Sequence, residues 1–374
     1  MPGLALLSAG GTGGHLFPAE ALALALKARG WKVHLATDHR AETYGQNFPA
    51  EAIHIIPSAK MERSPLALMQ AAFRLTTGVL AARVLVRRIK PDVAIGFGGY
   101  PTVPPMLAAT RARVPSIIHE QNAVIGRANK YLAPRVTRIA TSFAKVGKAE
   151  IFAPKMTQTG NPVRPAVREA AKVPFASRGA DDPFNLLVFG GSQGARVMAE
   201  LVPPAIAALD PSLRGMLRIV QQCRPEDMER VADAYKANGV AADLQPFFRD
   251  LPARIAACHL VVSRAGASTV AELGVIGRPA IMIPLPHALD QDQMANARVL
   301  SGAGGGWTVE QSAVTPASLA ADIATLIRSP EQLASAAAAA RATGRPDAVD
   351  RLADLVEQVA ASGPRVILNQ EALA

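Results

Sequence analysis

The chain is poor in cysteine, which limits what can hold it together. Cys223 and Cys258 are its only two in 374 residues, so a disulfide framework and a four-thiolate zinc site are excluded and a reducing compartment fits. Aromatic residues are also few, at 5%. Hydrophobic residues nevertheless reach 49% against 19% charged, which excludes a chain that is disordered as a whole. The length fits two or three domains.

Long apolar runs are missing too. No stretch approaches the roughly 18 uninterrupted apolar residues of a membrane-spanning helix. No basic segment precedes the apolar residues near the N-terminus, so we expect no signal peptide. The sequence therefore predicts a soluble or peripheral protein.

Acidic residues are scarce in the first half of the chain. Residues 1–164 contain 21 Lys and Arg against 8 Asp and Glu, whereas residues 165–374 contain 19 against 22. Nucleic acid, an anionic membrane or an anionic substrate would each explain a basic first half. Because no stripe of interleaved arginines and aromatics accompanies the charge, nucleic acid is the least favoured of the three.

The sequence does contain a repeated order of apolar run, glycine-rich turn and helix-length segment. Short continuous apolar runs are typical of buried parallel strands. The expected strands are Leu4–Ala9, Trp31–Thr37, Ala52–Pro57, Asp92–Phe97, Ser116–His119, Arg138–Ser142, Asn185–Phe189, Leu217–Gln221, Leu244–Phe248, Leu260–Ser263 and Ala280–Ile283. The expected helices include Pro18–Arg29, Leu66–Ile89, Thr102–Ala112, Ile125–Leu132 and Pro346–Ala360. This alternation predicts an α/β fold of doubly wound parallel sheets.

The two halves open alike. Each has a strand followed by Gly-Gly-Ser/Thr-x-Gly, at Gly10–Gly14 and Gly190–Gly194, and the second glycines are 180 residues apart. We interpret this as two Rossmann-like domains, over residues 1–162 and 163–344, joined at a proline-stiffened linker near Asn161–Pro165. Residues 345–374 would form a last helix and a tail.

Several polar residues of the first half lie where ligands bind in such folds. Glycines directly after a parallel strand present amide N–H groups at a helix N-terminus, where anions bind. His15 follows the first such turn and is a candidate general base, the alternative being a histidine bonded to its own loop. His119–Asn122 ends a strand, where ligands gather in open α/β sheets. Asp38, after the second strand, would suit the ribose of a dinucleotide.

In the second half, small residues follow the strand Leu260–Ser263. Ser268 or Thr269 can cap the next helix, and Glu272, one turn inside it, can accept both vicinal hydroxyls of a ribose. A carboxylate that only favours the helix dipole is the alternative. Asp290–Asp292 forms a D-x-D pattern, but polar helix N-termini look the same, and we expect no metal site there.

Six motifs in a fixed order carry a family resemblance. They are Gly10–His15 with Pro18, Gly98–Tyr100, His119–Asn122, Gly160–Arg164, Gly190–Ala195 and Arg264–Thr269. Together they resemble the MurG family, bacterial enzymes that add N-acetylglucosamine to lipid I (undecaprenyl-pyrophosphoryl-N-acetylmuramyl-pentapeptide) and so make lipid II for peptidoglycan. The match covers nearly the whole chain. The resemblance implies a GT-B fold, in which two Rossmann-like domains face a cleft and the last helix returns to the first domain.

The resemblance also implies roles in binding the donor, UDP-N-acetylglucosamine. Arg164 and the backbone of Phe248 would hold the uracil, Glu272 the ribose, and Ser192 with its turn the diphosphate. The residues implied around the sugar and in the same substrate-binding segment are Asn122, Ala267, Ser268, Thr269 and Gln293. Asp292 departs from the family, which often has a second glutamine there.

For the reaction, the resemblance implies a single inverting displacement. Thr12, Gly13 and Gly14 would close the cleft from the first domain. His15 would take the proton of the muramyl 4-hydroxyl, which attacks the anomeric carbon as UDP leaves. Helix N-termini and oriented N–H groups can stabilise the leaving diphosphate, so no metal or other cofactor is expected.

Three alternatives remain open from the residues. A UDP-N-acetylglucosamine 2-epimerase uses the same two-domain plan but transfers no sugar. An NAD-dependent oxidoreductase would use the first glycine turn and Asp38, and would leave the second turn unexplained. A sugar-nucleotide sensor without activity would need Glu272 and Arg164 but not His15.

The expected helix Leu66–Ile89 has two apolar stripes. One, formed by Leu68, Leu75, Val79, Ala82, Val86 and Ile89, is long enough to be the core face. The other, formed by Leu66, Met69, Phe73 and Leu80, has Arg63, Arg74, Arg83 and Arg87 around it. Apolar residues rimmed by arginines suit an anionic membrane surface. We therefore predict a peripheral protein, and the resemblance implies that the membrane is the bacterial inner membrane, at its cytoplasmic face. A helix broken at Gly78, or one buried on both sides, is the alternative.

Overall fold

The fold is taken from a computed structural model that describes residues 3–10, 13–39, 48–58, 65–179, 182–191, 196–286 and 291–363. The chain forms two compact units. Unit 1 comprises Met1–Pro162 with Asp347–Ala374, and unit 2 comprises Val163–Pro346.

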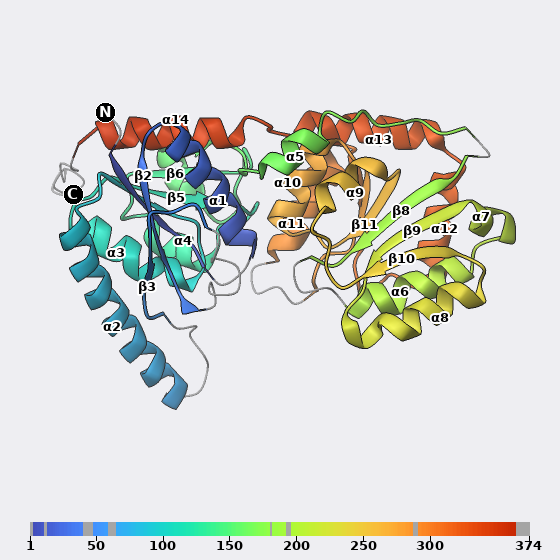
Figure 1. The fold of residues 1–374 in the computed structure, drawn as a ribbon, viewed down its shortest axis with the longest axis horizontal. Coiled ribbons are helices and arrows are strands. Elements are labelled where there is room, and N and C mark those ends of the chain that lie inside the picture. Colours follow the sequence, from blue (N-terminus) through green and yellow to red (C-terminus); the bar gives the residue numbers. More distant parts are fainter. Residues whose placement is uncertain are drawn as a thin grey trace. The chain divides into compact units, whose positions relative to one another are not determined.

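Unit 1 is built on a seven-stranded parallel sheet of order β3-β2-β1-β4-β5-β6-β7 (Figure 1). Its strands are β1 (Leu4–Ser8), β2 (Lys32–Thr37), β3 (Ala52–Ile55), β4 (Val93–Gly96), β5 (Ser116–Glu120), β6 (Arg138–Thr141) and β7 (Met156–Gln158). The direction of winding reverses between β1 and β4, which is where open α/β sheets bind their ligands.

Helices cover both faces of that sheet. They are α1 (Gly13–Ala28), α2 (Pro65–Ile89), α3 (Val103–Arg111), α4 (Arg127–Leu132) and α14 (Ala348–Ala361). Side chains alternate along β1, so Ala5 and Leu7 join a core with α1 and α14, while Leu6 joins a second core with α2 and α3. The last helix α14 packs against α1, as Figure 1 shows.

Unit 2 repeats the plan with a six-stranded parallel sheet of order β10-β9-β8-β11-β12-β13. Its strands are β8 (Phe184–Phe189), β9 (Leu217–Gln222), β10 (Ala241–Gln245), β11 (Leu260–Ser263), β12 (Ala280–Met282) and β13 (Gly306–Thr308). Its helices are α5 (Pro165–Ala170), α6 (Arg196–Ala207), α7 (Pro211–Met216), α8 (Met228–Ala237), α9 (Leu251–Ala257), α10 (Ala267–Ile276), α11 (Asp292–Gly302), α12 (Pro316–Ile327) and α13 (Pro330–Thr343). Here the winding reverses between β8 and β11.

Three edge strands depart from the predicted elements. β7 and β13 were not predicted, since each spans only three residues. The predicted strand Leu244–Phe248 is wrong by three residues, because β10 runs over Ala241–Gln245 and Phe248 lies beyond it. β10 is an edge strand with its first three residues exposed, so it lacks the apolar run of a buried strand.

Helix α2 continues unbroken through Gly78, so the predicted helix Leu66–Ile89 is confirmed and the alternative of a break at Gly78 is not. A Cβ at that position would lie 2.0 Å from the carbonyl oxygen of Pro57, so glycine allows the helix to approach the chain after β3. No helix among the described residues is both long and apolar enough to cross a membrane.

Candidate active site

His15 lies in the first turn of α1, at the carboxyl edge of the unit 1 sheet, and is partly buried. Its ring lies beside the backbone of Gly98 and Gly99, whose φ angles of +85° and +77° require glycine. A Cβ on Gly98 would lie 3.4 Å from His15 Nε2. The Gly98–Tyr100 motif therefore forms the surface against which the imidazole packs.

Two side chains fix that glycine pair in place. Thr102 Oγ1 donates to the carbonyl of Gly98 at 2.6 Å, and Gln121 Nε2 donates to the carbonyl of Phe97 at 2.8 Å. Both side chains are buried. Of the other residues expected beside His15, Gly13 is buried and Gly14 exposed, while Thr12 lies outside the described residues.

Glu120 is a buried carboxylate that organises the next strand end. It accepts hydrogen bonds from both Asn122 N (3.0 Å) and Asn122 Nδ2 (3.3 Å), from Gly126 N (2.9 Å) and from Asn129 Nδ2 (2.8 Å). Burial raises the pKa of this carboxyl, and the four donors oppose that rise. Asn122, a residue predicted to bind the sugar, is thus oriented by a fixed partner.

His119, in the same motif, is structural. Its ring is fully buried and Nε2 lies 3.0 Å from the carbonyl of Gly160. Burial lowers the pKa of His119 to about 4, so the ring is neutral near pH 7 and its Nε2 proton points to Gly160. The side chain ties β5 to the segment that leads out of unit 1.

In unit 2, the fold brings Arg164 and Glu272 together from 108 residues apart. Arg164 is the residue before α5, Glu272 lies in α10, and Arg164 Nη2 is 3.4 Å from Glu272 Oε1. Burial raises the pKa of Glu272, and the charge and hydrogen bond of Arg164 oppose that rise. A buried carboxylate beside one arginine is suited to accept further hydrogen bonds from hydroxyl groups.

The N-terminus of α10 has no side-chain cap. Gly266 precedes the helix with extended backbone, so the first N–H groups, from Ala267 to Thr269, have no capping side chain. Ser268 Oγ is buried and has no hydrogen-bond partner among the described residues. Oriented N–H groups of this kind attract anions.

Two side chains brace the turn before α10. Arg264 Nη1 donates to the carbonyls of Ile283 and Pro284 at 2.9 and 3.1 Å, and Asn296 Nδ2 donates to the carbonyl of Ala265 at 3.2 Å. Gln293 Oε1 accepts from Leu285 N at 3.0 Å, so this predicted sugar ligand also holds the segment after β12.

Phe248 lies past the end of β10 and is buried, with the guanidinium of Arg254 4.5 Å from its ring centre. Arg254 is itself held by Asp243 at 2.6 Å and Asp250 at 2.8 Å. These contacts fix the position of the Phe248 backbone.

At the end of β8, Gly191 has a φ of +91°, which again requires glycine. Ser192 lies outside the described residues, as does Asp290 of the D-x-D pattern. Where the structure describes side chains, no group of three or more His, Cys, Asp or Glu is gathered as metal ligands would be.

The sequences that form the two sheets match the two domains of one enzyme family. Residues 5–141 match the N-terminal domain of glycosyltransferase family 28, and residues 185–352 match its C-terminal domain. The chain belongs to glycosyltransferase family 28. It is therefore an enzyme of the glycosyltransferase class, and the predicted family is confirmed.

Similar family 28 proteins are named UDP-N-acetylglucosamine--N-acetylmuramyl-(pentapeptide) pyrophosphoryl-undecaprenol N-acetylglucosamine transferase. That of Mesorhizobium japonicum is 55% identical over 359 residues, which cover 96% of each chain. That of Sinorhizobium fredii is 54% identical over 371 residues, which cover 99% of each.

Solved structures agree with the fold. The crystal structure of Acinetobacter baumannii MurG has a TM-score of 0.76 and 30% identity, covering 95% of this chain and 99% of that one. The predicted GT-B fold class is confirmed. The UDP-GlcNAc 2-epimerase of Neisseria meningitidis has a TM-score of 0.67 at 14% identity over 96% of this chain, a likeness of fold alone.

Proposed function

We propose that this chain transfers N-acetylglucosamine from UDP-N-acetylglucosamine to the 4-hydroxyl of the muramyl sugar of lipid I, giving lipid II and UDP. The observation that carries the proposal is the identity of 52–55% with the transferases of this name, over 96% of the chain. Family membership favours transfer over the epimerase, oxidoreductase and sensor alternatives.

In this proposal unit 2 binds the donor. Glu272 accepts hydrogen bonds from the two ribose hydroxyls, and Arg164 beside it favours the charged carboxylate and faces the uracil. The backbone at Phe248 recognises the base, and Ser192 and its turn bind the diphosphate. Gln293 and the segment Ala267–Thr269 contact the sugar from unit 2.

Charge develops on the diphosphate as the bond to the sugar breaks. The uncapped N–H groups at the start of α10 can stabilise it without rearranging, which is the usual source of large electrostatic rate effects. No step of this mechanism requires a metal.

His15 is the proposed general base. It removes the proton of the acceptor hydroxyl, whose oxygen then attacks the anomeric carbon on the face opposite UDP. Its ring is braced by Gly98 and Gly99, and a fixed orientation is what a base needs for proton transfer. Thr12, Gly13 and Gly14, just before it in the chain, are proposed as substrate-binding residues of the first domain.

The membrane contact is proposed on α2. Of the predicted stripe, Met69, Phe73 and Leu80 have 71%, 70% and 57% of their surface exposed. Val84, which was not predicted, is 65% exposed, and we name these four residues the α2 apolar face. The opposite stripe packs into the core, with Ala82 and Val86 buried and Leu75, Val79 and Ile89 half-buried, as predicted. Arg74, Arg83 and Arg87 are exposed along the helix. Leu66 and Leu68 have no described side chains, and Arg63 lies outside the described residues.

Lipid I is anchored in the membrane by its polyprenyl chain, so an enzyme that uses it must reach that surface. The α2 apolar face with its arginines has the composition of a peripheral contact with anionic lipid. The proposed location is the cytoplasmic face of the inner membrane.

The experiment that tests the proposed function measures UDP release with and without a soluble lipid I analogue. Release that depends on the acceptor supports transfer. Conversion of UDP-N-acetylglucosamine to its 2-epimer without the acceptor would identify an epimerase instead, and tight UDP binding without either product would identify a sensor.

A further inference from the structure

Gln222, the last residue of β9, links two turns of unit 2 through one side chain. It is 7% exposed. Its Oε1 accepts from Gly190 N at 3.1 Å, and its Nε2 donates to the carbonyl of Pro246 at 3.3 Å. Gln222 is not among the residues proposed above for catalysis or binding.

The two partners lie just past the ends of the strands on either side of β9. Gly190 follows β8 and begins the glycine turn proposed for the diphosphate. Pro246 follows β10 and begins the short segment to Phe248, whose backbone is proposed for the uracil. Because β9 lies between β8 and β10, a side chain at its end reaches both.

We propose that Gln222 is a positioning residue for the donor. Its amide fixes the spacing between the backbone that binds the diphosphate and the backbone that binds the base. This inference rests on the proposed function. A carboxamide suits the role because it accepts with one end and donates with the other, whereas a carboxylate only accepts and a thioether does neither to any useful extent.

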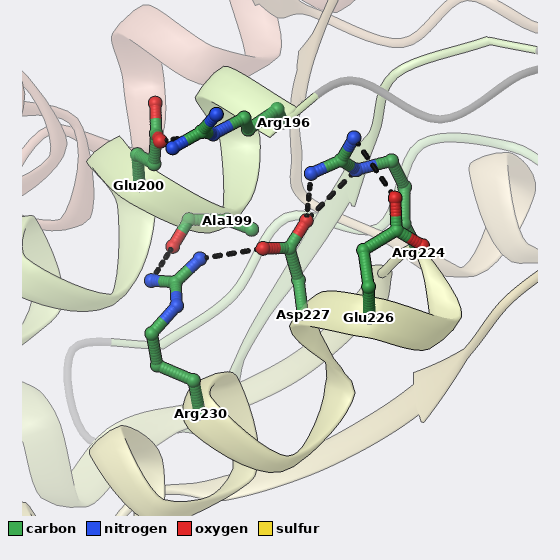
Figure 2. A network of polar contacts seen from close by, with 7 residues as sticks. All are labelled: Arg196, Ala199, Glu200, Arg224, Glu226, Asp227 and Arg230. Atoms are coloured by element: carbon green, nitrogen blue, oxygen red, sulfur yellow. Dashed lines mark hydrogen bonds and ion pairs between the residues drawn. The ribbon is translucent and has the colours of Figure 1, made fainter.

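The scaffold around Gln222 is held by other contacts. Asp227 accepts from Arg224 at 2.6 and 2.8 Å and from Arg230 at 2.8 Å (Figure 2). Arg230 also donates to the carbonyl of Ala199 in α6 at 3.1 Å. The two arginines lower the pKa of Asp227 by these hydrogen bonds, so it stays ionised. This network ties the chain after β9 to α6 independently of Gln222.

The other side of the linkage is braced as well. Arg254 packs on the Phe248 ring, and the backbone bond from Cys223 N to the carbonyl of Gln245 (2.9 Å) extends the pairing of β9 with β10. Removing the Gln222 amide should therefore change the local spacing of the two turns and leave the sheet intact.

The adjacent residue provides a matched control. Gln221 is fully buried on the opposite face of β9, where Gln221 Oε1 accepts from the hydroxyl of Tyr235. It is the same residue type on the same strand, but its partner lies in α8 and belongs to the core. Its loss should affect stability and not the donor.

The test compares Gln222→Met, Gln222→Glu and Gln221→Met in the full chain. Gln222→Met should raise the KM for UDP-N-acetylglucosamine and the Kd of UDP by roughly 5- to 30-fold, as expected for two neutral hydrogen bonds, with kcat within about 3-fold. Gln222→Glu keeps an acceptor for Gly190 N but places a negative charge against the Pro246 carbonyl and beside the diphosphate turn, so it should give a larger rise. Gln221→Met should lower the Tm and leave KM unchanged.

The inference is overturned if folded Gln222→Met keeps the wild-type KM and UDP affinity, including the case in which it only loses Tm as Gln221→Met is expected to do. Should Gln222→Met fold poorly, Gln222→Ala decides in the same way, because it removes both hydrogen bonds and adds no charge beside the diphosphate turn. A wild-type protein that neither binds nor releases UDP would instead contradict the proposed function.

Discussion

At the scale of single residues, two buried carboxylates have opposite surroundings. Glu120 accepts hydrogen bonds from three different residues and so serves as a fixed support. Glu272 faces one arginine at 3.4 Å, a distance that leaves the pair weakly coupled. Of the two, only Glu272 therefore has acceptor oxygens left for the hydroxyl groups of a ligand. Its substitution should lower the affinity for the donor.

Glu272→Gln should raise the Kd of UDP about 10- to 100-fold, because a hydrogen bond to a charged group contributes about 1.5–3 kcal/mol. Isothermal titration calorimetry with UDP measures this. Asp210→Asn is the control, since Asp210 pairs with Arg328 on the surface of the same unit. Unchanged UDP affinity in the folded Glu272 variant would show that the ribose binds elsewhere.

His15→Ala should lower kcat by about 10²- to 10⁴-fold with little change in UDP affinity, because a general base acts only on the acceptor proton. Steady-state kinetics with saturating donor and acceptor provides the measurement, with His54→Gln at the sheet edge as the control. A variant whose turnover falls only as far as its folded fraction would make His15 structural.

His119 makes unit 1 sensitive to acid. Its folded pKa of about 4 lies below the ordinary 6.5, so the unfolded chain binds the extra proton first, and stability is lost as the pH falls from about 6.5 towards 4. At pH 5 the loss should be about 2 kcal/mol relative to pH 7.5. His119→Gln should remove this part of the pH dependence, which Tm values at the two pH values report. Equal pH dependence in variant and wild type would contradict it.

At the scale of elements, the central strands could be predicted and the edge strands could not. β1 and β4 are buried almost throughout, and their sequences are nearly continuous apolar runs. β10 lies at an edge, where packing on its neighbour and not its composition determines where it begins. Helix α2 illustrates the same limit, because only the contact with Pro57 explains why Gly78 lies within a continuous helix.

Gly78→Ala should destabilise unit 1 by about 1–3 kcal/mol, because the added Cβ would overlap the Pro57 carbonyl and displace α2. Gly215→Ala in α7 is the control: no atom lies within 4 Å of its added Cβ, and alanine favours a helix by about 0.5–1 kcal/mol. Thermal unfolding of both variants gives the comparison, and equal Tm values would refute the close-approach argument.

The α2 apolar face should carry membrane binding. Co-sedimentation with phosphatidylglycerol vesicles should be strong for the wild type at low salt and weaker at high salt. A Phe73→Asp, Leu80→Asp double variant should bind weakly at both. Ile151→Asp is the control, because Ile151 is 80% exposed in unit 1 but lies outside α2. A folded double variant that binds vesicles like the wild type would exclude this face.

At the scale of the whole molecule, the two units share one strand order, and each opens with a glycine turn after its first strand. That likeness is visible in the sequence because the same Gly-Gly-Ser/Thr-x-Gly pattern follows the first strand of each unit. The candidate site was predictable where a motif follows a strand end, as at His15 and Glu272. Asn129, Gln222 and Arg254 were missed because each acts through a partner distant in sequence and belongs to no local pattern.

The measurement that tests the central claim most directly is the proton NMR spectrum of the product made from UDP-N-acetylglucosamine and a lipid I analogue. The donor sugar is α-linked to UDP, so a single displacement predicts a β-linked disaccharide on the acceptor, formed in step with UDP. An α-linked product, or a free epimerised sugar nucleotide with the acceptor unchanged, would contradict the account.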